Sequence, residues 1–177
     1  MFSHTLCLSK NEYGYLELKP VKVNQCTDAW GLFNGEFSAK NHLFKITREF
    51  NLCDKINGIS EARGNCANYL EGKCNGACVQ KEDVETYNER ILEALQKYSL
   101  RNREVVLVDK GRDVGEYAAI MVRKGSLVGV GYYDLNHQIN NIHILENLIT
   151  PMNGTHNANF IIESYLRKRK IFKTISL

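Results

Sequence analysis

The stretch CDKINGISEARGNCANYLEGKCNGAC, residues 53–78, decides the fold, because it gathers four of the chain's six cysteines into one short segment. These are Cys53, Cys66, Cys74 and Cys78, in the spacing C-x12-C-x7-C-x3-C. Glycines interrupt the segment and no long apolar period runs through it, so it is expected to be mostly loop with one short turn. What this loop does therefore depends on what the four thiols bind.

Three interpretations of the thiols compete. Two disulfides are disfavoured if the protein lies in a reducing cytoplasm. Four unrelated buried cysteines would need apolar neighbours, whereas this loop is polar and rich in glycine. One metal centre fits best, because thiolates are soft ligands for zinc or iron–sulfur and nearby glycines let backbone N–H groups approach the sulfurs. The spacing matches neither zinc-ribbon knuckles nor ferredoxin runs, so it leaves the metal open.

Two further cysteines lie outside this segment. Cys7 falls in an expected strand and is interpreted as a core residue, and Cys26 is interpreted as a loop thiol.

The composition is that of an ordinary soluble globular protein, with 44% hydrophobic residues, 24% charged residues and a net charge of +3. No run approaches about 18 consecutive apolar residues, so no transmembrane helix is expected. The first residues lack the basic and apolar regions of a secretion signal. These features predict a cytoplasmic protein, and so mild a charge does not by itself indicate a nucleic-acid partner.

Regular elements are expected on both sides of the cysteine loop. Residues 4–23 read as a hairpin that turns at residues 11–14, with Pro20 indicating an edge strand. Residues 38–52 read as a helix with Ser38 as its N-cap. Helix 81–98 carries one apolar stripe, formed by Val84, Tyr87, Ile91, Leu95 and Tyr98.

After residue 101 the pattern changes from loop and helix to strands. Strands are expected over 103–109, 116–122 and 127–134, the last two joined by a turn that contains Gly125. Helices are expected over 141–149 and 157–170, followed by a final strand over 171–177. The sequence predicts an α+β protein of two small lobes. Residues 1–100 would form a hairpin and helices around the four-cysteine loop, and residues 101–177 a short antiparallel sheet with C-terminal helices.

Two long stretches resemble a known family. FNGEFSAKNHLFKITREFNLC, residues 33–53, and KCNGACVQKEDVETYNERILEAL, residues 73–95, are similar to the middle region of UvrC-type excision-repair nucleases. The second stretch resembles even more closely the sequences of bacterial proteins that fuse a DnaQ-like 3′–5′ exonuclease to a UvrC-like GIY-YIG module. Residues 105–170 also resemble the C-terminal part of those fusions.

The resemblance implies a cofactor and partners. It implies that Cys53, Cys66, Cys74 and Cys78 ligate a [4Fe–4S] cluster, with zinc as the alternative. Four thiolates close such a site, so its role would be structural or DNA-responsive rather than catalytic. The resemblance further implies DNA as a partner, and a protein partner docked on helix 81–98.

The departures from the family pattern concern catalysis. The GIY-YIG motifs do not occur in order, and GVGYYD at residues 129–134 lies on the wrong side of the cysteine loop. The acidic motifs of the exonuclease are missing as well. We therefore expect an accessory module of a DNA repair nuclease, not an enzyme by itself. The alternative is a free-standing, zinc-stabilised protein-interaction module without a nucleic-acid role.

Candidate DNA contacts are cationic side chains of the second lobe. They are Arg101, Arg103, Arg123, Lys124, Arg167, Lys168, Arg169 and Lys170. A separate, less favoured hypothesis gives the chain a Mg²⁺ nuclease site made of Asp109, Glu116 and Asp134, which lie at expected strand ends.

Overall fold

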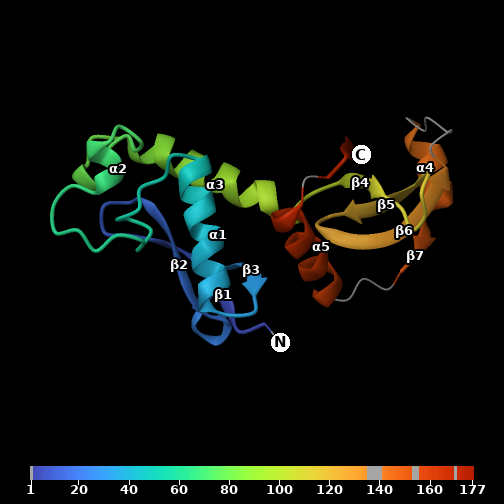
Figure 1. Ribbon diagram of the computed structural model, residues 1–177, viewed down its shortest axis with the longest axis horizontal. Helices are drawn as coiled ribbons and strands as arrows, with labels where there is room; N and C mark the ends of the chain where they lie inside the picture. Colours follow the sequence, from blue (N-terminus) through green and yellow to red (C-terminus); the bar gives the residue numbers. More distant parts are fainter. Residues whose placement is uncertain (1, 135–140, 153–155, 170) are drawn as a thin grey trace. The chain divides into compact units, whose positions relative to one another are not determined.

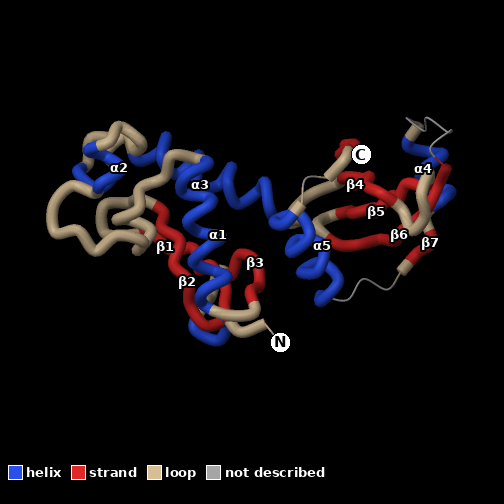
Figure 2. Tube along the Cα trace, viewed as in Figure 1, coloured by secondary structure: helices blue, strands red, loops and turns tan. Residues whose placement is uncertain are grey.

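Figure 1 shows the computed structural model of the chain, which describes residues 2–134, 141–152, 156–169 and 171–177. The chain divides into two compact units, Met1–Ser99 and Leu100–Leu177. Each unit combines helices with an antiparallel sheet, as Figure 2 shows, and this confirms the predicted α+β class. Within the described residues, no helix has the length and apolar character that crossing a membrane requires.

The first unit contains a three-stranded antiparallel sheet in the order β2-β1-β3. Its strands are β1 (His4–Lys10), β2 (Leu16–Lys22) and β3 (Ala29–Phe33). The predicted hairpin is confirmed, and the Asn11 side chain fixes its turn by accepting the N–H groups of Tyr13 and Tyr15, each at 3.0 Å. Pro20 lies on the edge strand, where its missing N–H is tolerated. Strand β3 was not predicted.

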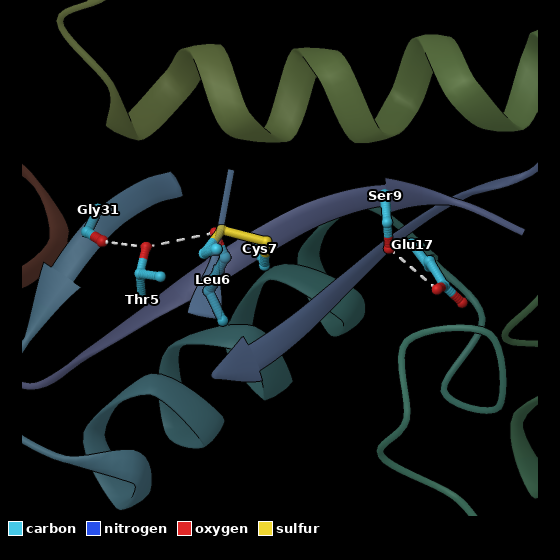
Figure 3. Close-up of a disulfide and its surroundings, with 7 residues drawn as sticks. Thr5, Leu6, Cys7, Ser9, Glu17 and Gly31 are labelled. Atoms are coloured by element: carbon cyan, nitrogen blue, oxygen red, sulfur yellow. Dashed lines mark hydrogen bonds between the residues drawn. A yellow bond between two sulfur atoms is a disulfide. The ribbon is translucent and has the colours of Figure 1, made fainter. Parts of the chain in front are cut away.

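The structure corrects both predictions for the outlying cysteines. Cys7 and Cys26 form a disulfide, with Cα atoms 5.6 Å apart (Figure 3). The physical reason is the pairing of β1 with β3, because Cys7 lies opposite Ala29 and Cys26 precedes Ala29 by three residues. Thr5 strengthens the same pairing, since its hydroxyl donates to the carbonyl of Gly31 at 2.7 Å. The disulfide thus secures the connection between β2 and β3, which contains the short 3-10 helix η1 (Val23–Gln25).

Two long helices complete the core of the first unit. They are α1 (Glu36–Glu49) and α3 (Val84–Tyr98). Helix α1 begins before the predicted N-cap: Gly35 is the cap, and the Ser38 hydroxyl donates back to the Gly35 carbonyl at 2.9 Å. Asp83 is the N-cap of α3, and its carboxylate accepts the N–H of Thr86 at 2.9 Å. Its predicted apolar stripe is confirmed, because four of the five residues are buried and Val84 packs against the same core.

The second unit contains a five-stranded antiparallel sheet in the order β7-β6-β5-β4-β8. Its strands are β4 (Val105–Lys110), β5 (Glu116–Arg123), β6 (Ser126–Asp134), β7 (Thr150–Pro151) and β8 (Lys173–Ser176). The predicted β5–β6 turn is confirmed, with Lys124 and Gly125 at φ values of 48° and 74°. The short strand β7 was not predicted.

One helix packs on each side of this sheet. They are α4 (Ile142–Leu148) and α5 (His156–Lys168). Ile162 of α5 packs with Leu107 and Val122, whereas Leu145 of α4 packs with Val106 and Met121. Since neighbouring residues of a strand point to opposite sides, the runs of valine, leucine and isoleucine in β4 and β5 supply both apolar layers.

Two glycines of β6 let the chain after α4 lie directly on the sheet. A Cβ atom on Gly129 would stand 2.2 Å from the carbonyl oxygen of Thr150, and one on Gly131 would stand 2.5 Å from that of Leu148. Real side chains do not tolerate such distances, so backbone fills the space that other residues would give to side chains.

Candidate metal centre

The cysteine loop is hydrogen-bonded to β2 and to both long helices of the first unit. Apart from two short helical turns, α2 (Ala67–Leu70) and η2 (Ala77–Val79), it consists of turns, as predicted. Cys53 follows the end of α1, Cys66 is the N-cap of α2, and Cys78 lies within η2. Cys53, Cys66 and Cys74 are buried and Cys78 is partly exposed. Local turns thus bring cysteines from distant loop positions inward.

Three of the four thiols, those of Cys53, Cys66 and Cys78, meet in one place. The Sγ atoms of Cys53 and Cys66 lie 3.9 Å apart, and those of Cys66 and Cys78 lie 3.7 Å apart. Cys53, Cys66 and Cys78 lie within 4.8 Å of one another, which is close enough for the three thiols to bind a metal ion. Cys74 interacts with the thiols of Cys53 and Cys66, and its sulfur accepts the N–H of Gly76 at 3.4 Å.

The electrostatics of the cluster are unequal. The pKa of the Cys74 thiol is lowered to about 6, first because the Cys53 thiol donates to it and then because the N–H groups of Gly76 and Ala77 point at it. The same contact with Cys74, together with burial, raises the pKa of Cys53, and burial raises the pKa of Cys66. Cys74 is thus the thiol that the protein best prepares to be a thiolate.

The separations between thiols fit a metal. Sulfur atoms bound at about 2.3 Å to one tetrahedral ion lie about 3.8 Å apart, close to the 3.7 and 3.9 Å found here. Backbone N–H groups aimed at a ligand sulfur are the usual outer contacts of such a site. Within the described part of the chain, Cys53, Cys66 and Cys78 form the one group of cysteine, histidine or acidic side chains close enough to hold a metal.

A buried asparagine connects the loop to the rest of the unit. The Asn57 amide nitrogen donates to the carbonyl of Cys53 at 2.8 Å and to the hydroxyl of Tyr87 at 2.9 Å. Its amide oxygen accepts the N–H of Leu18 at 2.9 Å. One side chain therefore ties the first cysteine to both β2 and α3. In the sequence, Asn57 precedes Gly58 and looks like an ordinary turn residue, so its role was missed.

An ion pair secures the same turn from the other side. Arg48 of α1 binds Asp54 with two hydrogen bonds, of 2.8 and 3.2 Å. The backbone carbonyl of Asp54 in turn accepts the N–H groups of Ile59 and Ser60. Further along, the Lys81 ammonium lies over the ring of Tyr69, 5.4 Å from its centroid. These contacts order the loop without using a thiol.

The expected DNA-binding cations fall into two groups in the second unit. Arg101, Arg103, Arg123 and Lys124 come together at the β5–β6 turn, where the N–H of Gly125 donates to the Arg103 carbonyl at 3.0 Å. The other group lies at the C-terminal end of α5 and consists of Arg167 and Lys168 in its last turn and Arg169 directly after it. Lys170 lies outside the described residues.

Two of these arginines are turned partly inward. Burial lowers the pKa of the Arg103 and Arg167 guanidinium groups, and the charge of nearby Glu163 opposes this shift in both. Arg123 forms an ion pair with Glu146. The exposed cations of the set are Arg101, Arg123, Lys124, Lys168 and Arg169.

The acidic residues of the nuclease hypothesis do not gather into a metal site. Asp109 accepts a hydrogen bond from the Tyr165 hydroxyl at 2.7 Å. Glu116 forms an ion pair with Arg112 at 2.7 Å, and it lies opposite Asp134 in register. Among the described residues, no cluster of acids meets the distances that metal binding requires.

Comparison with known proteins gives one match. The family model of the UvrC/Cho excinuclease middle domain matches residues 4–97, which include all four cysteines of the loop. No curated protein and no solved structure matches the chain.

Proposed function

The chain belongs to the UvrC/Cho excinuclease family through the middle domain that residues 4–97 form, and we propose that it is an accessory module of a UvrC-like DNA repair nuclease. Its task would be to bind DNA, or a partner protein, beside a catalytic domain. Cleavage would come from a GIY-YIG or exonuclease domain of the kind that the related nucleases contain. The setting proposed for this role is cytoplasmic and bacterial, and the Cys7–Cys26 disulfide is a feature that a reducing cytoplasm disfavours.

One observation carries the proposal. The residues matched by the family model contain four cysteines spread over 26 residues. The sulfurs of Cys53, Cys66 and Cys78 meet in one place, and Cys74 interacts with the thiols of Cys53 and Cys66. Chance burial of cysteines does not require that their sulfurs meet, whereas a shared metal does. We therefore propose Cys53, Cys66, Cys74 and Cys78 as the ligands of one metal centre.

Two cofactors are candidates for this centre. Resemblance to UvrC-type proteins implies a [4Fe–4S] cluster, in which each thiolate binds a different iron. The observed separations of 3.7 and 3.9 Å favour a single zinc ion, because ligands of one ion lie closer together. In either case four thiolates close the coordination sphere, so the centre would order the loop rather than carry out a reaction.

DNA would be bound by the exposed cations of the second unit. A family of excision-repair nucleases implies an interaction with DNA. The group around the β5–β6 turn and the group at the end of α5 give positive charge suited to phosphates. Because these residues would contact the backbone only, they would add affinity without sequence preference.

The alternative is a metal-stabilised protein-interaction module. Helix α3 supports it, because Leu92 is 41% exposed and has the exposed acidic residues Glu89 and Glu93 beside it. An apolar side chain with an acidic surround is suited to a partner with a basic rim. Such a protein would bind its partner and show no affinity for DNA.

Two measurements on the whole chain test the proposal. Metal analysis for iron, zinc and acid-labile sulfide on protein purified without oxygen should find about four irons with sulfide, or one zinc, per chain. Titration of labelled duplex DNA at several salt concentrations should give an affinity that falls steeply with salt. Absence of metal in folded protein would contradict the shared site. Metal-loaded protein without DNA affinity would favour the interaction module instead.

A further inference from the structure

A row of aromatic rings crosses one side of the sheet of the second unit. Tyr133 of β6 lies opposite Tyr117 of β5, with ring centroids 5.5 Å apart. Phe172, just before β8, stacks on Tyr117 with centroids 5.1 Å apart and ring planes at 27°. Three rings from three segments of the chain thus form a continuous set, here called the aromatic row.

Phe172 is the exposed end of the aromatic row. Its side chain is 65% exposed, whereas Tyr117 and Tyr133 are partly buried against the apolar layer that contains Met121 and Leu145. Tyr117 supports one side of the Phe172 ring and so restricts its orientation. A flat apolar ring that is held in place and open to solvent is a suitable surface for stacking another flat ring.

Positive charge lies beside this ring. Lys110 is opposite Tyr117 in the β4–β5 pair and Lys173 is opposite Val108 in the β4–β8 pair, so both lysines point to the side of the aromatic row. Both are exposed.

The neighbouring acids point away from the row. Glu116 and Asp134 adjoin Tyr117 and Tyr133 in sequence, and therefore lie on the opposite side of the sheet. Glu116 is engaged there by Arg112. The side that bears the aromatic row is thus cationic as well as aromatic.

We propose that Phe172, supported by Tyr117, is a stacking site for an unpaired base of single-stranded DNA, with Lys110 and Lys173 at the adjoining phosphates. Stacked aromatic rings with lysines around them are the combination by which proteins bind single strands, because every base offers a flat face and every nucleotide a charge. An acidic peptide would match the charge but leave the ring without a flat partner. In a duplex the bases are paired and stacked, so the site selects single strands.

This inference rests on the proposed DNA-binding function and adds which form of DNA is bound. The first test is fluorescence anisotropy of the whole metal-loaded chain with a labelled thymidine oligonucleotide of about 12 nucleotides and a duplex of equal length. The single strand should bind more tightly. Phe172→Ala should weaken single-strand binding about 5- to 150-fold, the range for loss of one base–aromatic stack, and should leave duplex binding within twofold.

Two matched variants make the test specific. Phe172→Tyr keeps a ring and should restore binding of the single strand. Ile161→Ala removes an apolar side chain of the same 65% exposure in the same unit, and should have no effect. Lys110→Gln should reduce the salt dependence of binding by about one released counterion.

A second test does not depend on any variant. An oligonucleotide with abasic sites retains its phosphates and lacks bases to stack, so the unmodified protein should bind it as weakly as Phe172→Ala binds the intact strand. Equal affinity for abasic and intact strands, or an unchanged affinity in Phe172→Ala, would overturn the stacking site. The stacking site would also be overturned if an acidic peptide competed with the single strand and if Phe172→Ala weakened binding of the peptide as much as binding of the strand. If the protein binds duplex and single strand equally, only this inference fails. If it binds neither, the proposed DNA function fails with it.

Discussion

The side-chain amide of Asn57 donates a hydrogen bond to the hydroxyl of Tyr87, 2.9 Å away, and both side chains are wholly buried. Thirty residues separate the two in sequence, and the contact joins the cysteine loop to helix α3. Since the same asparagine also bonds to Cys53 and Leu18, it holds the place where loop, helix and sheet meet.

Asn57→Ala should therefore be strongly destabilising. It leaves the buried N–H of Leu18 without the Asn57 oxygen, and a buried group left unsatisfied costs about 1–3 kcal/mol. It also removes one hydrogen bond each from the Tyr87 hydroxyl and from the Cys53 carbonyl, which keeps the backbone N–H of residue 57. We expect a loss of about 3 kcal/mol in the free energy of unfolding, measured by urea denaturation of the metal-loaded protein. Tyr87→Phe, which removes one bond, should cost about 1 kcal/mol. Asn41→Ala on the exposed side of α1 should stay within about 0.5 kcal/mol; an equal effect at both asparagines would contradict this role.

Gly76 should not accept a side chain. Its φ is +94°, and an added Cβ would lie 2.9 Å from the Tyr69 ring and 3.2 Å from the Cβ of Lys81. Gly76→Ala should cost about 2 kcal/mol of stability and weaken metal binding, because Gly76 also donates to the Cys74 sulfur. Gly64→Ala in the same loop is the control, since nothing lies within 4 Å of its added Cβ. Zinc competition with a chromogenic chelator, alongside urea denaturation, would compare the two variants.

Loss of one cysteine of the proposed metal centre should lower the amount of metal bound per chain, whereas a control substitution in the first unit should not. Cys66→Ser removes the thiol that lies 3.9 and 3.7 Å from two others, so metal per chain should fall sharply. Gly64→Ala changes the same loop without removing a thiol and should leave metal per chain unchanged, since nothing lies within 4 Å of the added Cβ. Elemental analysis of both proteins after the same purification decides the matter. Equal metal in the two variants would exclude Cys66 as a ligand.

The Cys7–Cys26 disulfide should stabilise the first unit by restricting its unfolded chain. Cys7 and Cys26 are 19 residues apart, and closing a loop of that length restricts the unfolded chain by about 3 kcal/mol. The paired variant Cys7→Ser with Cys26→Ser should lower the free energy of unfolding by up to about that amount. Thiol titration of the unfolded wild type should count four free thiols in oxidised protein and six after reduction. Six thiols before reduction would show that the two cysteines are not bonded.

The pH dependence of Glu116 follows from its ion pair. Hydrogen bonds from the Arg112 side chain, then from the Arg112 backbone N–H, lower the pKa of this carboxyl to about 2. A lowered pKa in the folded state stabilises the fold above the ordinary value of 4.5, and this contribution disappears as the pH falls towards 2. An NMR titration of the Glu116 side chain should give a midpoint near 2. In Arg112→Gln the midpoint should return towards 4.5, and an unchanged midpoint would show that Arg112 is not the cause.

The sequence predicted elements whose signals are local. The stripe from Val84 to Tyr98 needs only helical periodicity, and the β5–β6 turn needs only Gly125 in a short polar link. Strand β3 and the Cys7–Cys26 bond were not predicted, because both depend on which strand lies beside β1. The gathering of the loop thiols, found for Cys53, Cys66 and Cys78, could be expected from their spacing and from the family resemblance. Asn57 could not be predicted, since its three partners are far apart in sequence and no local pattern indicates them.

The glycines of β6 have a consequence for how variants of this protein should be interpreted. In GVGYYD, residues 129–134, Gly129 and Gly131 look like part of a nuclease motif, yet both are required by the backbone of residues 148–150 that lies on them. Almost every missense change at these codons would therefore be harmful through misfolding. Intolerance to mutation at these two positions would reflect the close packing of β6 against residues 148–150, and should not be taken as a sign of catalysis.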